Sequence, residues 1–378
     1  MSINNFLVVS RASPFSKSGS GEVANQFLSF FSKDEIVFLC EKNNGISVDS
    51  EQIHYVNLYP INIRRGKRFI RWQRWFLLPS LVNKIVSLAI NENSKSIMCF
   101  YPDEIYLIAS SIAAKKLGIP IYPYFHNLFF ENKSGIPALL ARFVQKRIFT
   151  QAPWVYLISK GLLNEIAKGY PNTDFRVLTH TASIQEDLSQ NSSNLKNVKT
   201  KFTFLGHINN SNIDSMSYIL NAIGRRDDFI VELITQNSIH FLKKNQLIKK
   251  NTVINNNISD KALLGKLRGS DILLLPHGMD GPLSHAEYRS AFPTKTIKYL
   301  QSGTPILALL PLNCYLHDFL AKNQCAFCLS TKNEQEFYSA IEKILNNSNS
   351  KIKNNTEQVV KEFSQHRVLQ KLRQEIFV

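Results

Sequence analysis

The hydrophobic pattern in the first half of the chain alternates short apolar runs with longer stretches of helical periodicity. The apolar runs predict strands at 6–10, 36–40, 96–101, 120–125 and 154–158. Helical periodicity predicts helices at 22–31, 104–117, 137–149 and 161–169. Because parallel strands need long crossover connections, this alternation predicts a doubly wound, parallel α/β sheet.

The same alternation restarts after a polar segment at 189–200, which predicts a linker. Strands are expected at 201–205, 229–235, 271–275 and 305–309, with helices at 215–223, 260–268 and 294–302. The fold class that follows is α/β, with two doubly wound, Rossmann-like domains facing each other across a cleft. We expect an N-terminal domain at 1–188, a C-terminal domain at 201–355, and a helix within 356–378 that packs back across the hinge.

Composition restricts the class of protein. Among the 378 residues, 44% are hydrophobic and 20% are charged, which favours a globular protein over a disordered or coiled-coil one. The excess of 45 Lys and Arg over 29 Asp and Glu gives a net charge of +16. Such a charge favours a polyanionic partner: nucleic acid, an anionic membrane or a phosphorylated small molecule.

Cysteine content and apolar run length bear on the compartment. The five cysteines are an odd number and too sparse for a disulfide framework, which indicates a reducing compartment. The first residues lack the pattern of a signal peptide, and no apolar run approaches the ~18 residues of a membrane span. We therefore expect a cytoplasmic protein that is soluble or peripheral on the inner face of the membrane.

The helix predicted at 294–302 carries the clearest local chemistry. Pro293 suits its first turn and Gly303 its C-terminal cap. Its start would present amide groups, the hydroxyls of Thr294 and Thr296, and the cation of Lys295. Those groups suit an anion such as a diphosphate, because the helix dipole favours negative charge there. A well-capped core helix explains the same residues equally well.

This segment, FPTKTIKYLQSGTPILA at 292–308, resembles a motif of the GT-B glycosyltransferases, especially the large retaining family four. Three further segments resemble that family in the same order along the chain. They are FLVVSRASPFSKSGSG at 6–21, YFHNLFFE at 124–131 and TFLG at 203–206. Together the motifs span most of the sequence, and they are more specific than any one of them alone.

The resemblance implies a set of site residues and a reaction. Donor and phosphate contacts would come from both domains, and their positions are Gly19, Ser20, Gly21, Gly206, Thr294, Lys295, Thr296 and Lys298. His126, after a predicted strand, would contact the donor sugar or move a proton; the alternative is a structural histidine. Lys298 stands where the family usually has a ribose-binding Glu, and Asn127 where it has an Asp. The family also implies retention of anomeric configuration and no metal.

The function that these features predict is transfer of a hexosyl group from a UDP- or GDP-linked sugar to a growing, lipid-linked bacterial surface glycan. The nucleotide sugar is a substrate, and no cofactor is expected. Two alternatives keep the fold: a non-catalytic sugar- or nucleotide-binding partner of another transferase, and an epimerase of nucleotide sugars. A basic nucleic-acid-binding protein is a further alternative. No nucleic-acid-binding motif is visible, so a nucleic-acid partner is not expected.

A basic and aromatic segment lies between Glu51 and Glu92, where the chain has seven Lys and Arg residues and no acidic residue. Trp and Phe among Arg residues are typical of an interfacial membrane element. A solvated face of a core helix and an RNA-binding surface are the other interpretations. The proposed membrane patch consists of Arg64, Arg65, Lys67, Arg68, Arg71, Trp72, Arg74 and Trp75.

Other candidate side chains carry weaker signals. His277 and His285 flank a loop after a predicted strand, whereas His180 is expected at the surface or in the hinge. Four residues could be drawn as zinc ligands, but they fall on a predicted helix and a predicted buried strand: Cys314, His317, Cys325 and Cys328. Structural cysteines are therefore expected, and no metal site.

Overall fold

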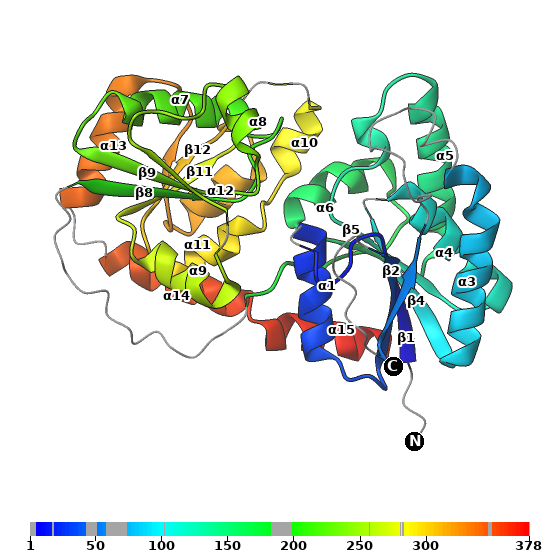
Figure 1. Cartoon of the computed structure of the whole chain (residues 1–378). Coiled ribbons are helices and arrows are strands. Elements are labelled where there is room, and N and C mark those ends of the chain that lie inside the picture. Colours follow the sequence, from blue (N-terminus) through cyan, green and yellow to red (C-terminus); the bar gives the residue numbers. More distant parts are fainter. Residues whose placement is uncertain are drawn as a thin grey trace. The chain divides into compact units, whose positions relative to one another are not determined.

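The computed structural model divides the chain into two compact units (Figure 1). Unit 1 consists of Met1–Thr181 and Gln365–Val378, and unit 2 of Ala182–Ser364. The structure describes residues 5–16, 19–42, 51–57, 74–101, 103–182, 199–256, 258–279, 281, 283–346 and 350–377. The chain thus passes from unit 1 to unit 2 and returns to unit 1 for its last residues.

Unit 1 is built on a parallel sheet of seven strands in the order β3-β2-β1-β4-β5-β6-β7. Their bounds are β1 (Asn5–Ser10), β2 (Ile36–Glu41), β3 (Ile53–Val56), β4 (Ser94–Tyr101), β5 (Ile121–Phe125), β6 (Val155–Leu157) and β7 (Phe175–Val177). All six residues of β1 and of β2 are buried, as expected for central strands covered on both faces. The strand order reverses between β1 and β4, which pair in parallel.

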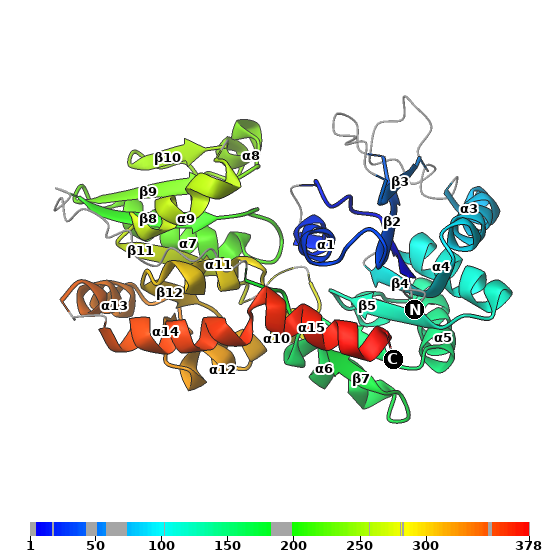
Figure 2. The ribbon, with the colours of Figure 1, turned by 90° about the horizontal axis from the view of Figure 1, so that it is seen from below.

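Helices cover both faces of this sheet. On one side lie α3 (Leu78–Asn91), α4 (Glu104–Leu117) and α5 (Ile136–Gln151), and on the other lie α1 (Gly19–Phe30) and α15 (Gln365–Ile376) (Figures 1 and 2). Short helical segments complete the unit: α6 (Lys160–Ile166), η1 (Phe130–Asn132) and η2 (Ala167–Gly169).

The last helix, α15, is tied to unit 1 by polar and aromatic contacts. Its Arg373 donates to Glu35 at 2.8 Å, and Glu375 accepts from the Tyr156 hydroxyl at 2.6 Å. The ring of Phe377, just beyond the helix, lies 5.4 Å from that of Phe6 in β1. These contacts explain why residues so far along the chain belong to the first unit.

Unit 2 repeats the architecture with six parallel strands in the order β10-β9-β8-β11-β12-β13. Their bounds are β8 (Thr200–Leu205), β9 (Phe229–Ile234), β10 (Thr252–Asn255), β11 (Ile272–Pro276), β12 (Ile306–Leu309) and β13 (Phe327–Leu329). Alternate side chains of one strand enter different cores, as the pleat requires: Leu274 lies in one apolar cluster, and Leu273 and Leu275 lie in the other.

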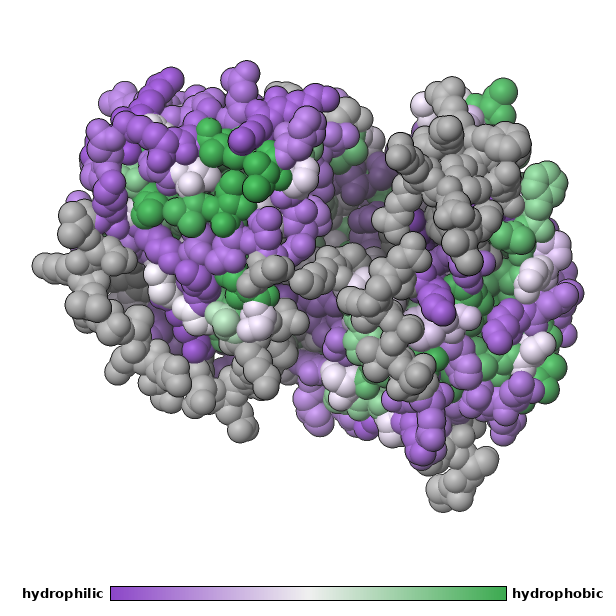
Figure 3. Space-filling model, viewed as in Figure 1, coloured by the Kyte–Doolittle hydropathy of each residue, from purple (hydrophilic) through white to green (hydrophobic). Residues whose placement is uncertain are grey.

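Two groups of helices complete these cores. The cluster that contains Leu274 includes buried residues of α7 (Ile213–Gly224), α8 (Ile239–Lys244) and α13 (Glu334–Asn346). The cluster that contains Leu273 includes residues of α9 (Asp260–Arg268), α11 (Lys295–Ser302), α12 (Tyr315–Lys322) and α14 (Ser350–Glu362). A short helix, α10 (His285–Ser290), follows β11. On the face shown in Figure 3, hydrophilic residues surround one continuous hydrophobic patch of this unit.

The prediction of two doubly wound, Rossmann-like sheets is confirmed. The sequence pattern missed the outer strands β3, β7 and β10, because they have only three or four residues and are largely half-exposed. It also joined α14 and α15 into one helix at 356–376. The structure breaks this stretch at Phe363 and Ser364, where Phe363 is buried and its carbonyl accepts the amide of Ala182 at 2.6 Å.

A buried ion pair fastens the start of α4. Arg74 donates to Asp103 at 3.1 Å, and the two residues are 7% and 5% exposed. Asp103 also caps α4 by accepting the amide of Ile105 at 3.1 Å. Arg74 was predicted to belong to an exposed membrane patch. That prediction is wrong, because the guanidinium is buried in the ion pair with Asp103.

We expect Asp103→Asn to destabilise unit 1 by about 3 kcal/mol, because it keeps the helix cap but leaves the Arg74 charge buried without its counter-ion. Urea unfolding followed by Trp fluorescence measures this loss, since the three tryptophans, Trp72, Trp75 and Trp154, all belong to unit 1. Glu51→Gln breaks the exposed pair with Lys33 in the same unit and should cost much less, because solvent screens that pair. Equal losses for the two variants would contradict the assignment.

Candidate functional site

The carboxyl edge of the unit 2 sheet holds a desolvated lysine amine at the point where the strand order reverses, between β8 and β11. The Nζ atom of Lys295, the first residue of α11, is shielded from solvent and has no hydrogen-bond partner among the described residues, although the residue is partly exposed as a whole. It lies 4.1 Å from the centroid of the Phe204 ring in β8. Desolvation lowers the pKa of this amine to about 7.

Gly206 follows β8 directly and faces the same lysine. Its φ of 111° lies in the region that side-chain-bearing residues rarely adopt. A Cβ atom there would lie 3.6 Å from Lys295 Nζ. The glycine therefore permits the backbone conformation next to the lysine amine. Gly206 and Lys295, both predicted as phosphate contacts, lie side by side in the structure.

Tyr299 fixes α11 against the ends of two strands. Its hydroxyl accepts the amide of Leu205 at 2.7 Å and donates to the carbonyl of Leu274 at 3.1 Å. The tyrosine is fully buried, and desolvation raises its pKa, so the hydroxyl keeps its proton. One side chain thus sets the position of Lys295 relative to β8 and β11. It was not singled out in the sequence, where it appeared only within the motif at 292–308.

The amides at the start of α11 are less available than the sequence suggested. Those of Thr296 and Ile297 donate to the carbonyls of Pro293 and Thr294, at 2.9 and 3.3 Å. Thr294 takes the N-cap position without a side-chain cap hydrogen bond. The hydroxyl of Thr296 is buried and has no partner among the described residues. An anion would therefore be met mainly by the Lys295 amine and this hydroxyl, and Lys298 lies one turn further along the helix.

His277 and His285 occupy different environments after β11. His277 is 3% exposed, and its Nε2 donates to the carbonyl of Tyr288 at 2.8 Å. Its own carbonyl accepts the Ser215 hydroxyl at 2.6 Å. His285 begins α10 and is exposed. His277 thus fastens the loop to α7 and α10, and these two hydrogen bonds explain its burial without a ligand.

Unit 1 has its own cluster at the corresponding edge of its sheet. His126 follows β5, and its Nδ1 lies 3.2 Å from the hydroxyl of Ser20 in the first turn of α1. Its Nε2 is buried and has no partner among the described residues. Desolvation, and then the nearby His180, lower the pKa of His126 to about 3. The ring is therefore neutral at pH 7 and keeps one nitrogen for a ligand.

His180 is the residue of this cluster that the sequence analysis misplaced. It was expected at the surface or in the hinge, but it is 6% exposed and its ring centroid lies 6.4 Å from that of His126. Desolvation lowers its pKa to about 4, and its buried Nδ1 has no partner among the described residues. The sequence VLTHTA gives no periodic signal for burial, because the segment follows a short strand and precedes the crossing into unit 2.

The glycine-rich loop is shorter than predicted, because α1 begins at Gly19. A Cβ atom at Gly21 would lie 2.1 Å from the Ser16 hydroxyl and 2.3 Å from the Ser16 carbonyl oxygen. Close packing of α1 on the preceding turn thus explains this glycine. Contact of Gly19, Ser20 and Gly21 with phosphate stays a prediction.

The membrane patch lies mostly outside the described residues. This holds for Arg64, Arg65, Lys67, Arg68, Arg71 and Trp72. Trp75 is 38% exposed, whereas Arg74 is buried as described above. No helix of the described chain is long and apolar enough to cross a membrane.

The cysteines of unit 2 occupy apolar surroundings. Cys314 and Cys325 are buried in the core formed by α11, α12 and α14. Cys314 Sγ caps α12 by accepting the amide of His317 at 3.4 Å. Burial raises the pKa of both thiols, to about 11 for Cys314 and about 12 for Cys325. Within the described ranges, no three His, Cys, Asp or Glu side chains are grouped to hold a metal.

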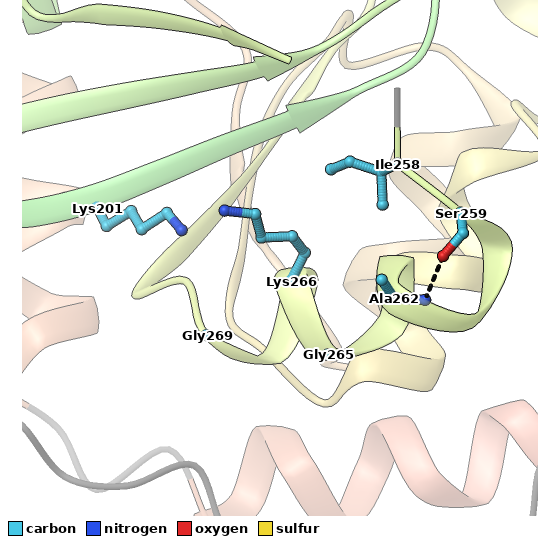
Figure 4. A pocket seen from close by; sticks show the side chains of 7 residues that line it. All are labelled: Lys201, Ile258, Ser259, Ala262, Gly265, Lys266 and Gly269. Atoms are coloured by element: carbon cyan, nitrogen blue, oxygen red, sulfur yellow. Dashed lines mark hydrogen bonds between the residues drawn. The ribbon is translucent and has the colours of Figure 1, made fainter. Parts of the chain in front are cut away.

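A cavity of about 490 Å³ lies at the opposite, amino edge of the unit 2 sheet, along α9 (Figure 4). Its residues are Lys201, Ile258, Ser259, Ala262, Gly265, Lys266 and Gly269. Figure 4 shows the two lysines extending toward one another. Both are paired with the buried Glu232, at 2.9 and 3.1 Å, so their charges are already balanced in part.

Solved glycosyltransferases share this fold over nearly the whole chain. A glycosyltransferase from Rickettsia africae ESF-5 aligns with a TM-score of 0.68 at 14% identity, over 99% of this chain and 98% of that one. The lipopolysaccharide outer core galactosyltransferase WaaB aligns at 0.63 with 13% identity, over 99% of both chains. Anabaena Alr3699/HepE, solved in complex with UDP, aligns at 0.69 with 13% identity, over 98% and 99%.

The chain has the GT-B fold. No family model and no curated protein sequence matches it. At these identities the GT-B likeness is one of architecture.

The two buried histidines make the stability of unit 1 depend on pH. Their pKa values are lower when folded than when unfolded, so protonation favours unfolding as the pH falls from about 6.5 toward 4. For each of the two histidines, the free energy of unfolding should fall by about 2 kcal/mol between pH 7 and pH 5, because the unfolded state binds a proton that the folded state does not. We expect His180→Gln to reduce this loss when urea unfolding is followed at both pH values by Trp fluorescence.

His366→Gln changes an exposed histidine of the same unit and is the matched control for the loss of a histidine. If His180→Gln shows the full loss between pH 7 and pH 5, His180 is not held neutral inside unit 1.

Proposed function

We propose that this protein transfers a hexosyl group from a nucleotide-sugar donor to a glycan acceptor. The observation that carries the proposal is the unpaired, desolvated Lys295 amine at the carboxyl edge of the unit 2 sheet. In open α/β sheets, ligands bind at this edge where the strand order reverses. A diphosphate is the group that this amine, the Thr296 hydroxyl and the bare backbone at Gly206 would suit.

The donor nucleotide is proposed to be UDP or GDP, and UDP is the first to test because Alr3699/HepE was solved with it. In the reaction, the bond between the anomeric carbon and the diphosphate oxygen breaks, a bond forms between that carbon and the acceptor oxygen, and the proton of the acceptor hydroxyl passes to the departing diphosphate. Charge develops on the departing diphosphate. A protonated Lys295 would stabilise that charge, and such stabilisation is generally a large part of catalysis.

His126 is proposed to contact the donor sugar. If the Ser20 hydroxyl donates to Nδ1, the ring carries its proton on Nε2 and can donate it in a hydrogen bond to a sugar hydroxyl. Burial keeps the ring neutral, which suits a neutral sugar better than an imidazolium would. Ser20 then acts as a positioning residue for the histidine.

Retention of configuration, independence of metal and a lipid-linked bacterial surface glycan as acceptor are further parts of the proposal. WaaB, which shares the fold, is a lipopolysaccharide galactosyltransferase, and the net charge of +16 suits work beside an anionic membrane. A reaction with purified lipid-linked oligosaccharide and each nucleotide sugar tests the acceptor. The anomeric configuration of the product, measured by NMR, tests retention.

A second candidate function rests on Lys298. A lysine has no acceptor for the two ribose hydroxyls, which a Glu at this position would bind. At a position proposed to face the ribose, it would favour a nucleotide with an extra phosphate or a different base. The protein would then bind a nucleotide sugar without turning it over, as a partner of another transferase. Binding without any release of nucleotide, in the presence of the acceptor, distinguishes this function from transfer.

Nucleoside diphosphate binding should take up a proton. With a pKa of about 7, Lys295 is mostly neutral at pH 8, and a bound diphosphate would protonate it. Calorimetry with UDP in buffers of different ionisation enthalpy should therefore report net proton uptake at pH 8. Lys295→Met should abolish the uptake and weaken binding about tenfold or more.

Lys322→Met, which changes an exposed lysine of the same unit, is the matched control and should bind UDP with the same proton uptake as the wild type. Unchanged affinity and uptake in Lys295→Met would remove the phosphate assignment.

His126→Ala should lower turnover about 100-fold or more while leaving the affinity for UDP within about twofold, because it is placed at the sugar and not at the diphosphate. Ser20→Ala should lower turnover less, since the ring stays and only its tautomer and orientation are released. Steady-state kinetics with the nucleotide sugar, together with UDP titrations, separate the two effects. Wild-type turnover in His126→Ala would return this residue to a structural role.

A further inference from the structure

Helix α5 of unit 1 has two apolar faces. The inner face contributes the buried residues Ala141, Ile148 and Phe149, and the ring of Phe149 lies 5.3 Å from that of Phe125 in β5. Gln145, also fully buried, donates to Glu131 at 3.0 Å and accepts the amide of Phe130 at 3.2 Å. These contacts attach the helix to the unit, so the outer face is not needed to hold it.

The outer face carries a ridge of large apolar side chains that are exposed to solvent. Ile136, Leu139, Leu140 and Phe143 are 74%, 69%, 64% and 67% exposed. With about 3.6 residues per turn, their spacing places all four along one line of the helix. We call these four residues the α5 ridge. A single exposed leucine is ordinary, but four together on one helix face are not.

The charges that helix α5 itself carries are all of one sign. Helix α5 contains no Asp or Glu. Arg147 follows the ridge by one turn, and Lys146 lies at its side; both are exposed and form no ion pair with the described residues. Arg142 flanks the same ridge, with its guanidinium 5.7 Å from the centroid of the Phe130 ring. The whole chain carries a net charge of +16.

We propose that the outer face of α5 is a membrane-binding surface that recognises anionic phospholipid. The α5 ridge enters the boundary between headgroups and acyl chains, while Arg142, Lys146 and Arg147 contact lipid phosphates. A helix that lies in the plane of a membrane needs this combination of an apolar line and flanking cations. A second copy of the chain fits less well, because it brings the same cations to the contact.

The residues of this surface are different from those of the proposed membrane patch, and the surface does not depend on the transfer reaction. In unit 1, α4 packs against both α3 and α5, so these helices share one side of the sheet (Figure 1). Trp75 and Phe76, just before α3, are 38% and 83% exposed on that unit. The ridge thus gives unit 1 an apolar anchor on this side of the sheet.

The experiment is co-sedimentation of the full chain with vesicles. One set contains phosphatidylcholine alone, and the other contains equal amounts of phosphatidylcholine and phosphatidylglycerol. We expect binding to the anionic vesicles that weakens in high salt without vanishing, because salt screens the cations but not the apolar ridge. Leu140→Gln with Phe143→Gln should lower the partition coefficient at least tenfold. Lys146→Gln with Arg147→Gln should lower it about fivefold per charge.

Leu312→Gln, at a single leucine of unit 2 that is 62% exposed, is the control for loss of an exposed apolar side chain and should bind vesicles as the wild type does. Far-UV circular dichroism and UDP affinity should be unchanged in every variant, which separates this inference from the proposed reaction. A depth readout comes from Phe143→Trp, whose fluorescence should be quenched by brominated lipid.

Two outcomes would overturn the proposal. One is wild-type protein that does not sediment with anionic vesicles at low salt. The other is a concentration-dependent dimer, seen by analytical ultracentrifugation, that disappears in Leu140→Gln with Phe143→Gln while vesicle binding persists. The second result would assign the ridge to contact between copies of the chain.

Discussion

Parallel strand pairing is the constraint on which the candidate sites depend. It brings the carboxyl ends of all strands of a sheet to one edge, and the reversal of strand order leaves room there between two diverging loops. In unit 2 the edge between β8 and β11 carries Gly206 and Lys295, and the Tyr299 hydroxyl bonds to both strand ends. In unit 1 the corresponding edge carries Ser20 and His126. The strand order of each sheet thus determines where its candidate site lies.

Desolvation is the physical effect that these sites share. Lys295, His126 and His180 are all placed where water cannot reach their free nitrogens, and in each case burial shifts the pKa toward the neutral form. A buried polar group without a partner costs stability, and in a folded protein it needs an explanation. A ligand that supplied the missing partner would explain the cost, and this is the role proposed for the donor at Lys295 and His126. The cavity at the amino edge lacks this property, because its two lysines already meet Glu232.

Helix α5 shows how one element can serve the fold and a surface at the same time. Its inner side chains pack on the sheet, and its outer side chains are equally apolar but are exposed to solvent. Such a helix has little separation between an apolar and a polar face. From the hydrophobic pattern alone, most of its residues would be predicted to lie in a core. The structure distinguishes the two faces, because only one of them can reach β5.

The sequence by itself determined the class of fold and most of its central elements. Alternation of apolar runs and helical periods is a local property, so α4 and α9 were predicted to the residue at 104–117 and 260–268, and the buried strands nearly so. The motif at 292–308 pointed to Lys295 and Thr296, and the Lys295 amine and the Thr296 hydroxyl have no hydrogen-bond partner among the described residues.

Only the tertiary structure decided which of these side chains are free. His180 and Arg74 lie in segments without a periodic signal, and their burial depends on elements distant in the chain: the neighbour of His180 is His126, and that of Arg74 is Asp103. The tight turn at 293–297 uses amides that a helix start would otherwise expose. Charge and polarity are properties of a residue, but solvent access and partners are properties of the packed chain. For that reason the sequence indicated which groups have the chemistry to bind a ligand, and packing decided which of them keep an atom without a hydrogen-bond partner.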